Sequence, residues 1–330
     1  MSATLTDGPA GRPRRPAAAA AAAGTPSFAT AVTADGSWIF CGGHVGKVWF
    51  ITGASRGFGR CWAQAAVARG DRVAVAARSE AALRAFADEH GDAVLPLPLD
   101  ITDRAAVFAA VQRAHAHFGR LDVVVNNAGV GLIGCVEEVT EDEVRAVVDA
   151  NILGTLAVTQ AALPLMRGQG GGHLIQVSSS GGIEAYPGMG LYCATKWAVE
   201  GMSEALADEV APFGIKVTVL EPGGYATDWF SAAPRSAPHP AYGPLHDLLD
   251  PTLTPETLPP PEATVPAVLA LVDSADPPRR LPLGSYALRA AAEAGQRRLD
   301  GLAAWDAVIR AADGVPATDA TPPSQEESLA

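Results

Sequence analysis

The chain has little that would suit it to nucleic acid or to a membrane. It contains 330 residues, with 24 lysines and arginines against 36 acidic residues, so its formal net charge is −12. The one basic segment, at 11–16, lies in a stretch rich in proline and alanine, and an acidic balance implies solubility rather than a nucleic-acid partner. No apolar run reaches the ~18 residues that would indicate a membrane span. We therefore expect neither nucleic acid nor membrane as a partner.

Cysteine is also scarce, and no metal-ligand spacing is present. The four cysteines, Cys41, Cys61, Cys135 and Cys193, are far apart and form no CxxC or Cys/His set. We expect no bound metal and reduced thiols, which places the protein in the cytoplasm. Cys193 is a candidate nucleophile by position alone, but no base is placed for it.

The two ends of the chain lack periodic patterns. Residues 1–45 are rich in Ala, Gly, Pro and Thr, and we expect them to be a disordered extension. Residues 13–24 faintly imitate a twin-arginine export signal, but alanine alone makes a weak hydrophobic region. Residues 313–330 are expected to be a disordered tail.

Between residues 46 and 312, short apolar runs alternate with segments of helical spacing. We expect strands at 47–53, 72–77, 93–100, 121–129, 173–180, 215–224 and 279–284, and helices at 57–70, 79–90, 104–119, 140–166, 192–211, 262–273 and about 286–312. This alternation predicts a single α/β domain, a Rossmann-like doubly wound parallel sheet of about seven strands with helices on both faces. Residues 226–261 have no clear period and are expected to form a lid over the substrate.

A glycine-rich turn follows the first expected strand. It runs from Thr52 to Gly59, with glycines at 53, 57 and 59, and leads directly into a helix. Such a turn lets backbone approach a phosphate, and the helix N-terminus then faces the anion. The spacing is a variant of the dinucleotide fingerprint, so the turn predicts a dinucleotide site.

The end of the second strand indicates which dinucleotide. An acidic residue there would bind the ribose hydroxyls of NAD, but the chain has Ala77 and then Arg78, while Arg56 lies in the glycine turn. Two guanidinium groups suit a 2′-phosphate, so we expect NADP(H) in preference to NAD(H).

Polar residues also stand at later strand ends and on the following helix. Asn126, Ala128 and Gly129 end the fourth strand, and Ser179 ends the fifth. Tyr192 and Lys196 are four positions apart, a spacing that puts both side chains on one face of a helix.

Taken together, these motifs resemble those of the short-chain dehydrogenase/reductase family, in its single-domain branch. The resemblance covers about residues 46–290 and rests on the TGxxxGxG turn, the NNAG segment, Asn151, Ser179 and the YxxxK pair. It implies a cofactor site formed by Thr52, Gly53, Ser55, Arg56, Gly57, Phe58, Gly59, Arg78, Asp100, Asn126, Ala128, Gly129, Tyr192, Lys196, Pro222, Gly223 and Thr227. It also implies a homodimer or homotetramer.

The same resemblance implies four catalytic residues. Tyr192 would be the general acid/base that exchanges a proton with a substrate oxygen. Lys196 would hold the nicotinamide ribose and, as a cation ~5 Å away, lower the pKa of Tyr192. Ser179 would polarise the substrate oxygen, and Asn151 would anchor a water that passes protons to Lys196.

These residues predict an NADP(H)-dependent oxidoreductase that interconverts a ketone and a secondary alcohol. The alternatives are a dinucleotide-binding sensor or scaffold without turnover, and an epimerase or dehydratase with a Tyr/Lys pair. The expected substrate is a hydrophobic small molecule, because the candidate pocket residues are mostly apolar and include no lysine or arginine. They are Val130, Leu132, Ile133, Tyr186, Met189, Tyr225, Trp229 and Phe230.

Overall fold

Seven short apolar segments form one parallel sheet, in the order β5-β4-β3-β6-β7-β8-β9. The computed structural model describes residues 30–32, 38–40, 46–249 and 257–314. The strands are β3 (Val48–Thr52), β4 (Arg72–Ala77), β5 (Val94–Pro98), β6 (Val123–Asn126), β7 (Gly172–Val177), β8 (Ile215–Pro222) and β9 (Arg280–Leu283). All seven predicted strands are confirmed, with ends shifted by at most three residues.

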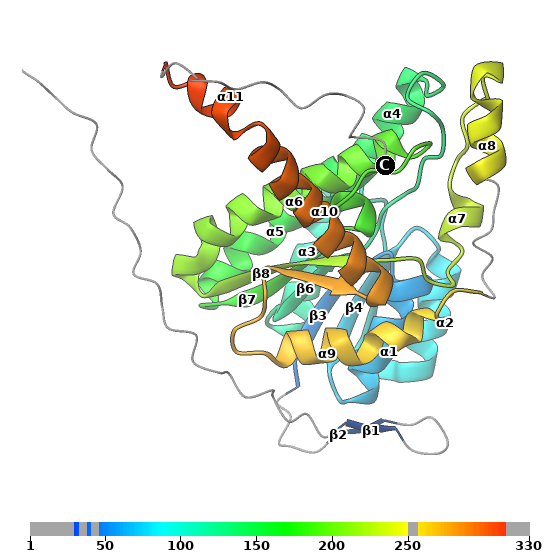
Figure 1. Cartoon of the computed structure of the whole chain (residues 1–330). Helices are drawn as coiled ribbons and strands as arrows, with labels where there is room; N and C mark the ends of the chain where they lie inside the picture. Colours follow the sequence, from blue (N-terminus) through cyan, green and yellow to red (C-terminus); the bar gives the residue numbers. More distant parts are fainter. Residues whose placement is uncertain (1–29, 33–37, 41–45, 250–256, 315–330) are drawn as a thin grey trace, which may run out of the picture. The chain divides into compact units, whose positions relative to one another are not determined.

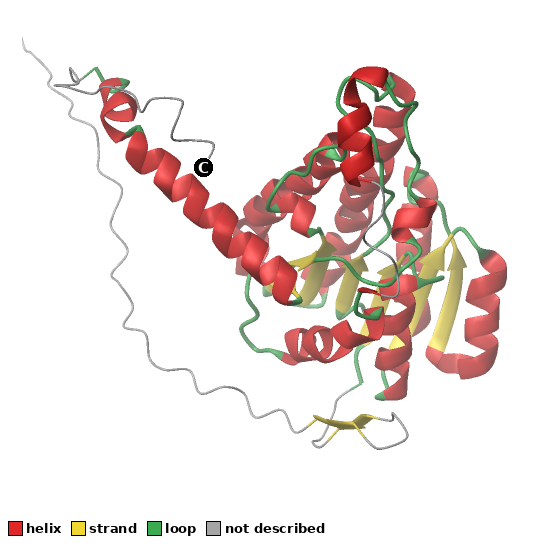
Figure 2. Cartoon of the chain, turned by 45° about the vertical axis from the view of Figure 1, so that its right-hand side comes forward, coloured by secondary structure: helices red, strands yellow, loops and turns green. Residues whose placement is uncertain are grey.

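The helices between the strands cover both faces of this sheet (Figures 1 and 2). They are α1 (Gly57–Ala68), α2 (Glu80–His90), α3 (Arg104–Phe118), α4 (Glu141–Val148), α5 (Thr155–Gly168), α6 (Gly190–Val210) and α9 (Val265–Asp273). Helices α10 (Ser285–Ala304) and α11 (Asp306–Ala311) follow the last strand. On one face, α3, α5 and α6 pack on the sheet, and on the other α1 contacts α9. The predicted doubly wound α/β fold is therefore confirmed.

Local sequence explains where several helices begin and end. The Asp103 side chain accepts a hydrogen bond from the Ala106 N–H at the start of α3, and Gly119 ends that helix in the left-handed conformation, with φ of 81°. Thr140 and Glu143 form a capping box at the start of α4. Helix α4 continues through a π-helical turn, Asp149–Gly154, into α5.

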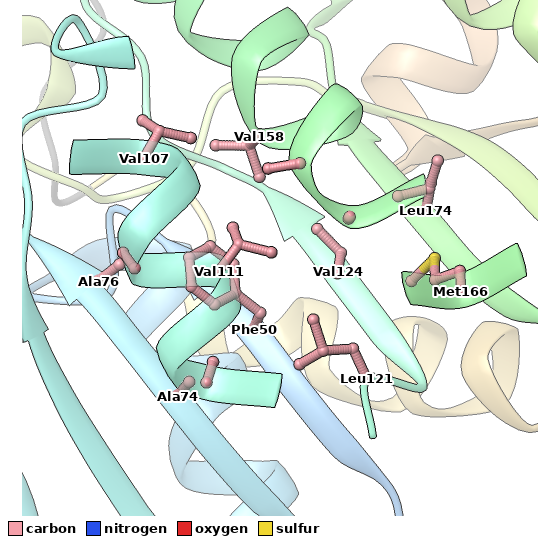
Figure 3. Packing of buried hydrophobic residues seen from close by; sticks show 14 of the residues in the cluster. Phe50, Ala74, Ala76, Val107, Val111, Leu121, Val124, Val158, Met166 and Leu174 are labelled. Carbon is pink, nitrogen blue, oxygen red and sulfur yellow. The ribbon is translucent and has the colours of Figure 1, made fainter. Parts of the chain in front are cut away.

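A large buried cluster lies between the sheet and helices α3 and α5 (Figure 3). Phe50 and Val124 of the central strands meet Val111 of α3 and Val158 of α5, and all four side chains are fully buried. Each buried side chain of this size stabilises the fold by roughly 1.5–3 kcal/mol. This packing fixes the central strands, whose carboxyl ends carry the site.

One continuous helical stretch of the described residues, Glu141–Gly168, is long and apolar enough to cross a membrane by length and composition, with a mean hydropathy of 1.4. In this fold 56% of that window is buried. Its α5 part packs against α3 and the sheet, as a core helix does.

Three regions differ from the sequence expectation. Residues 229–249 contain two short helices, α7 (Trp229–Ala232) and α8 (Gly243–Leu249), where no period was visible. The expected last helix is divided at Trp305 into α10 and α11. Contacts divide the chain into two units, Met1–Gly42 and Gly43–Ala330, and in the first β1 (Thr30–Val32) pairs antiparallel with β2 (Trp38–Phe40). The rest of the expected extension, and nearly all of the expected tail, lies outside the described residues.

Candidate active site

A cleft of about 1550 Å³ lies at the carboxyl ends of the parallel strands. Parallel strands bring the segments that follow them to one edge of the sheet, where ligands of doubly wound folds bind. The volume exceeds the 300–1,000 Å³ usual for one small ligand, so the cleft has room for a dinucleotide and a substrate together. Of the predicted site residues, those that line it are Gly53, Ser55, Arg56, Gly57, Phe58, Arg78, Asp100, Ala128, Gly129, Ser179, Tyr192, Lys196, Pro222, Gly223 and Thr227.

The glycine turn between β3 and α1 has the form needed to hold a phosphate. Gly53 and Gly57 adopt positive φ of 67° and 55°, which side chains disfavour. A Cβ on Gly59 would lie 2.7 Å from the Gly53 carbonyl oxygen, so only glycine lets the turn close here. No side chain caps α1 and no acidic residue lies in its first turn, so its free N–H groups suit an anion.

Thr52 and Asn127 hold this turn against the segment after β6. The Thr52 hydroxyl accepts hydrogen bonds from the backbone N–H groups of Asn127 and Ala128, each at 3.0 Å. The Asn127 side chain donates to the carbonyl oxygens of Thr52 and Gly53. Thr52 therefore stabilises the shape of the expected cofactor site without lining the cleft itself.

Three predicted cofactor residues do not line the cleft. They are Thr52, Gly59 and Asn126. Asn126 is buried and donates to the Thr159 hydroxyl at 3.1 Å and to the Gln176 side-chain oxygen at 2.9 Å. The structure thus gives these residues supporting positions, and direct cofactor contact stays a prediction for them.

The two arginines of the cofactor prediction lie on the cleft wall. The Arg56 side chain is 60% exposed and lies 3.4 Å from an Asp228 carboxylate oxygen. Arg78 directly follows β4 and is exposed. The pKa of Asp100 is lowered mainly by hydrogen bonds from Thr102, with a smaller effect of the Arg78 charge, so that carboxylate faces the same region.

Tyr192 and Ser179 meet at the inner end of the cleft. Tyr192 is 5% exposed, and its hydroxyl is hydrogen-bonded to Ser179. Its ring lies 4.8 Å from the ring of Trp229 on α7. Lys196, one turn further along α6, places its Nζ 5.8 Å from the Tyr192 ring centre and donates to the Val177 carbonyl at 2.9 Å. A buried phenol beside a serine hydroxyl and an apolar wall can exchange a proton with a substrate oxygen.

The protein's own groups do not lower the pKa of Tyr192. Burial raises the pKa of Tyr192 above its usual value, and the hydrogen bond to Ser179 opposes this only in part. Burial lowers the pKa of Lys196 to about 8, while the Glu200 carboxylate raises it. The cost of removing a phenolate from water is therefore the main influence on the pKa of Tyr192.

Asn151 lies in the π-helical turn, and its side chain connects that turn to the loop after β6 and to α6 by hydrogen bonds. Its side-chain oxygen accepts from the Val130 N–H at 2.8 Å, and its amide donates to the Val130 carbonyl and to the Thr195 hydroxyl. Thr195 in turn donates to the Tyr192 carbonyl at 2.7 Å. Asn151 is 1% exposed and does not line the cleft, so the structure gives it a positioning role; the water relay stays a prediction.

The substrate half of the cleft is mostly apolar, as expected. Seven of the eight predicted pocket residues line it: Val130, Ile133, Tyr186, Met189, Tyr225, Trp229 and Phe230. Leu132 does not; it is 3% exposed and packs behind the wall with Tyr192. Contrary to the expectation of no cation, Arg235 also lines the cleft.

Several lining or supporting residues were not predicted. Tyr286 of α10 lines the cleft and donates to the Tyr186 hydroxyl at 3.3 Å, but nothing in the sequence near it marks this. Thr195 and Glu200 could have been found from the sequence. Thr195 lies inside the Tyr192–Lys196 segment, and Glu200 follows Lys196 by four residues, the same spacing that singled out Tyr192 and Lys196.

The segment after β8 is hydrogen-bonded to the loop after β6. The Ile133 N–H donates to the Pro234 carbonyl, and the Ser236 N–H donates to the Ile133 carbonyl, both at 2.9 Å. Glu138 accepts from the His239 N–H and contacts the His246 ring, both at 2.7 Å. The part of the predicted lid up to residue 249 is therefore held against the loop after β6 by backbone hydrogen bonds and one buried carboxylate. Residues 250–256 of that segment lie outside the described residues, and its role as a lid stays a prediction.

The Glu138 carboxylate also belongs to a cluster whose potential ligand atoms are close enough together to hold a metal ion. Cys135, Glu138 and His246 each place one potential ligand atom within 4.8 Å of the others. Both oxygens of Glu138 already accept hydrogen bonds within the protein.

Comparison with known proteins identifies the family. A family model for short chain dehydrogenase matches residues 47–237. The chain is 42% identical over 257 residues to oxidoreductase BOA17 of Botryotinia fuckeliana, covering 76% of this chain and 93% of the relative. This chain belongs to the short-chain dehydrogenase family. It is also 40% identical over 181 residues to 3-ketodihydrosphingosine reductase of Bacteroides thetaiotaomicron, covering 55% of this chain and 65% of that protein.

Solved structures agree with this assignment. A short-chain dehydrogenase from Streptomyces avermitilis has a TM-score of 0.74 and 39% identity, covering 81% of this chain and 98% of that one. A 3-ketoacyl-(acyl-carrier-protein) reductase from Brucella melitensis, in complex with NADH, has a TM-score of 0.63 and 30% identity, covering 72% and 96%. This short-chain dehydrogenase is therefore an NAD(P)-dependent oxidoreductase, which favours an enzyme over a scaffold without turnover.

Proposed function

We propose that the protein is an NADP(H)-dependent reductase of a hydrophobic ketone, with Tyr192 as the general acid/base. The observation that carries this proposal is the buried Tyr192 hydroxyl, bonded to Ser179 and facing an apolar wall with Trp229. The nicotinamide supplies or accepts the hydride when bound. The names of two relatives, a 3-ketodihydrosphingosine reductase and a 3-ketoacyl-(acyl-carrier-protein) reductase, support a keto substrate.

The protein's own groups would divide the work as follows. The glycine turn and the N-terminus of α1 would hold the pyrophosphate, and Pro222, Gly223 and Thr227 would border the nicotinamide. Ser179 would donate a hydrogen bond to the substrate oxygen and so stabilise the negative charge that develops there. Tyr192 would give its proton to the same oxygen. Because burial raises the pKa of Tyr192, the phenol would hold its proton at neutral pH, the form that a proton donor needs.

The cofactor preference for NADP(H) rests on the two arginines. Arg56 and Arg78 offer guanidinium groups where the adenosine ribose would lie, and Ala77 replaces the acid that would favour NAD(H). The solved relatives include complexes with NADH and with 5-hydroxy-NADP, so the family admits both cofactors.

We also propose a homodimer or homotetramer in the cytoplasm. Leu153 in the π-helical turn and Trp197 on α6 are apolar and 51% and 41% exposed, which supports a subunit interface over these helices. Cys61, Cys135 and Cys193 are free thiols, which suits a reducing compartment. Light scattering during size-exclusion chromatography measures the oligomeric state.

The direct test of the activity is a panel of ketones mixed with purified protein and NADPH or NADH, followed by absorbance of the reduced cofactor. We expect turnover with long-chain or polycyclic ketones and NADPH. Absence of turnover with every ketone and alcohol, in both directions and with both cofactors, would contradict the proposal.

A further inference from the structure

A buried group of charges lies directly behind the catalytic lysine. Glu200 is on α6, one turn after Lys196, and is 7% exposed; Glu221, on β8, is 3% exposed. Arg280 of β9 places its Nε 2.9 Å from a Glu200 carboxylate oxygen and 3.8 Å from a Glu221 carboxylate oxygen. Glu200 and Arg280 do not line the cleft, and the reaction described above uses neither.

Arg280 alone does not neutralise the carboxylates of this group. Its guanidinium also contacts the exposed Glu204 at 2.7 Å, so one cation serves three carboxylates. Two of those carboxylates are almost completely buried, and a buried charge is costly unless it is paired. Burial and the Glu200 charge raise the pKa of Glu221 to about 7, so Glu221 can take up a proton. Glu200 has a second cation near it, because Lys196 lies on the adjacent turn of the same helix and its charge opposes the effect of burial on Glu200.

Two neutral residues, Ser178 and Gly182, lie beside the Glu200 carboxylate, so few further charged groups can contact it. A Cβ added to Gly182 would lie 2.3 Å from the Ser178 hydroxyl and 3.1 Å from the free carboxylate oxygen of Glu200, so both atoms border this glycine. The groups that face Glu200 are thus Lys196 and Glu204 on α6, Ser178 after β7, Glu221 on β8 and Arg280 on β9.

The interaction between the lysine and the carboxylate is reciprocal. Burial is the main influence on each group, lowering the pKa of Lys196 to about 8 and raising that of Glu200. The Glu200 charge opposes the first change, and the charges of Arg280 and Lys196 oppose the second. Each buried group therefore keeps its charge with the help of the other.

We propose that Glu200 is a positioning residue that keeps Lys196 protonated at neutral pH, and so keeps the Tyr192–Lys196 pair competent for proton exchange. Its consequence for turnover rests on the proposed function. The charge coupling itself does not, because it concerns only the protein's own groups.

The coupling can be measured without turnover, because the chain has only three lysines, Lys47, Lys196 and Lys216. The full-length protein is labelled with lysine carrying ¹³C at Cε, and the three resonances are followed by NMR from pH 5 to 11. The Lys196 resonance is assigned by its loss in K196R. In the wild type we expect it to titrate near pH 8, with a smaller change at acid pH as Glu200 takes up a proton. A Lys196 resonance that lacks this acid-range change would overturn the proposal, even if no variant folds.

Variants then assign the effect to the Glu200 charge. In E200Q the midpoint of Lys196 should fall by about one pH unit or more, because an opposite charge nearby shifts a pKa by roughly 1–3 units. In E204Q, which removes an exposed partner of the same arginine, the midpoint should stay within about 0.3 units, far less than such a shift. E200D keeps the charge and should restore most of the wild-type value. An unchanged midpoint in folded E200Q, or an equal fall in E204Q, would contradict the role of Glu200.

The pH profile of kcat/KM tests the functional consequence. For ketone reduction, the loss of activity at alkaline pH should begin about one unit lower in E200Q than in E204Q. If the wild type reduces no ketone while the NMR shift in E200Q is present, the proposed function fails and the coupling stands. If ketones are reduced and the two variants have identical pH profiles, the coupling has no role in turnover and the inference fails.

Discussion

We expect two single side chains on the cleft wall to decide which cofactor binds. Arg56 and Arg78 are exposed and close to the expected adenosine ribose, where a charged hydrogen bond contributes roughly 1.5–3 kcal/mol. R78D combined with R56A should therefore weaken NADPH binding by roughly tenfold or more and leave NADH binding nearly unchanged. Fluorescence titration with both cofactors measures the two dissociation constants.

A matched control for this pair is R84A. Arg84 lies on α2, is 70% exposed and pairs with Glu80, away from the cleft. Its removal should change neither constant. An equal loss of NADPH and NADH affinity in the double variant would reject the assignment of a 2′-phosphate site.

At this scale the sequence identified most of the site but not its electrostatics. The positions of Ser179, Tyr192 and Lys196 were predictable because each follows or faces a parallel strand end. The raised pKa of Tyr192 was not, because it depends on how completely other segments bury the ring. Arg235 was missed for a similar reason: it reaches the cleft only through its bridge to Ile133.

At the scale of elements, the close approach of α7 to the loop after β6 shapes the substrate site. A Cβ on Gly131 would lie 2.7 Å from the Ala233 Cβ and 2.7 Å from the Trp229 ring. G131A should displace α7, since added volume in a packed contact costs about 1–3 kcal/mol. We expect KM for a bulky ketone to rise roughly tenfold, with NADPH affinity retained.

Steady-state kinetics with G131A and G243A distinguishes the effect of a displaced contact from the effect of a glycine-to-alanine change alone. A Cβ on Gly243, in the same segment, would contact nothing within 4 Å, so G243A should keep the wild-type KM. Wild-type KM in G131A would show that α7 does not shape the substrate site.

The same segment marks where prediction of elements failed. The seven strands were predictable because buried parallel strands are short continuous apolar runs. Helices α7 and α8 span only four and seven residues, too short to show a helical period, and are held by bonds such as that from Tyr242 to Glu137. Their existence depends on distant residues rather than on local pattern.

For the whole molecule, stability should fall in mild acid because of one buried histidine. His173 on β7 is 4% exposed, and its Nε2 lies 3.0 Å from the Thr218 hydroxyl. That hydroxyl donates to the Pro278 carbonyl, so Nε2 is the nitrogen that carries the hydrogen. Burial lowers the pKa of His173 to about 3.

The sign of the effect follows from the unfolded chain, where histidine has a pKa of about 6.5. Between these values the unfolded state binds the extra proton, so stability is present above about pH 6.5 and is lost as pH falls toward 3. The total is on the order of 5 kcal/mol. Denaturant unfolding of wild type and H173Q between pH 7.5 and 4.5 should give a smaller loss in H173Q, whereas H117Q, at an exposed position, should behave as wild type. Parallel losses in all three proteins would contradict this.

The measurement that tests the central claim most directly compares wild type and Y192F with NADPH and an accepted ketone. We predict that kcat falls by at least ~100-fold, the usual contribution of a general acid, while the dissociation constant for NADPH stays within about threefold. A variant that binds NADPH and turns over at a rate close to wild type would contradict the assignment of Tyr192 as the proton donor.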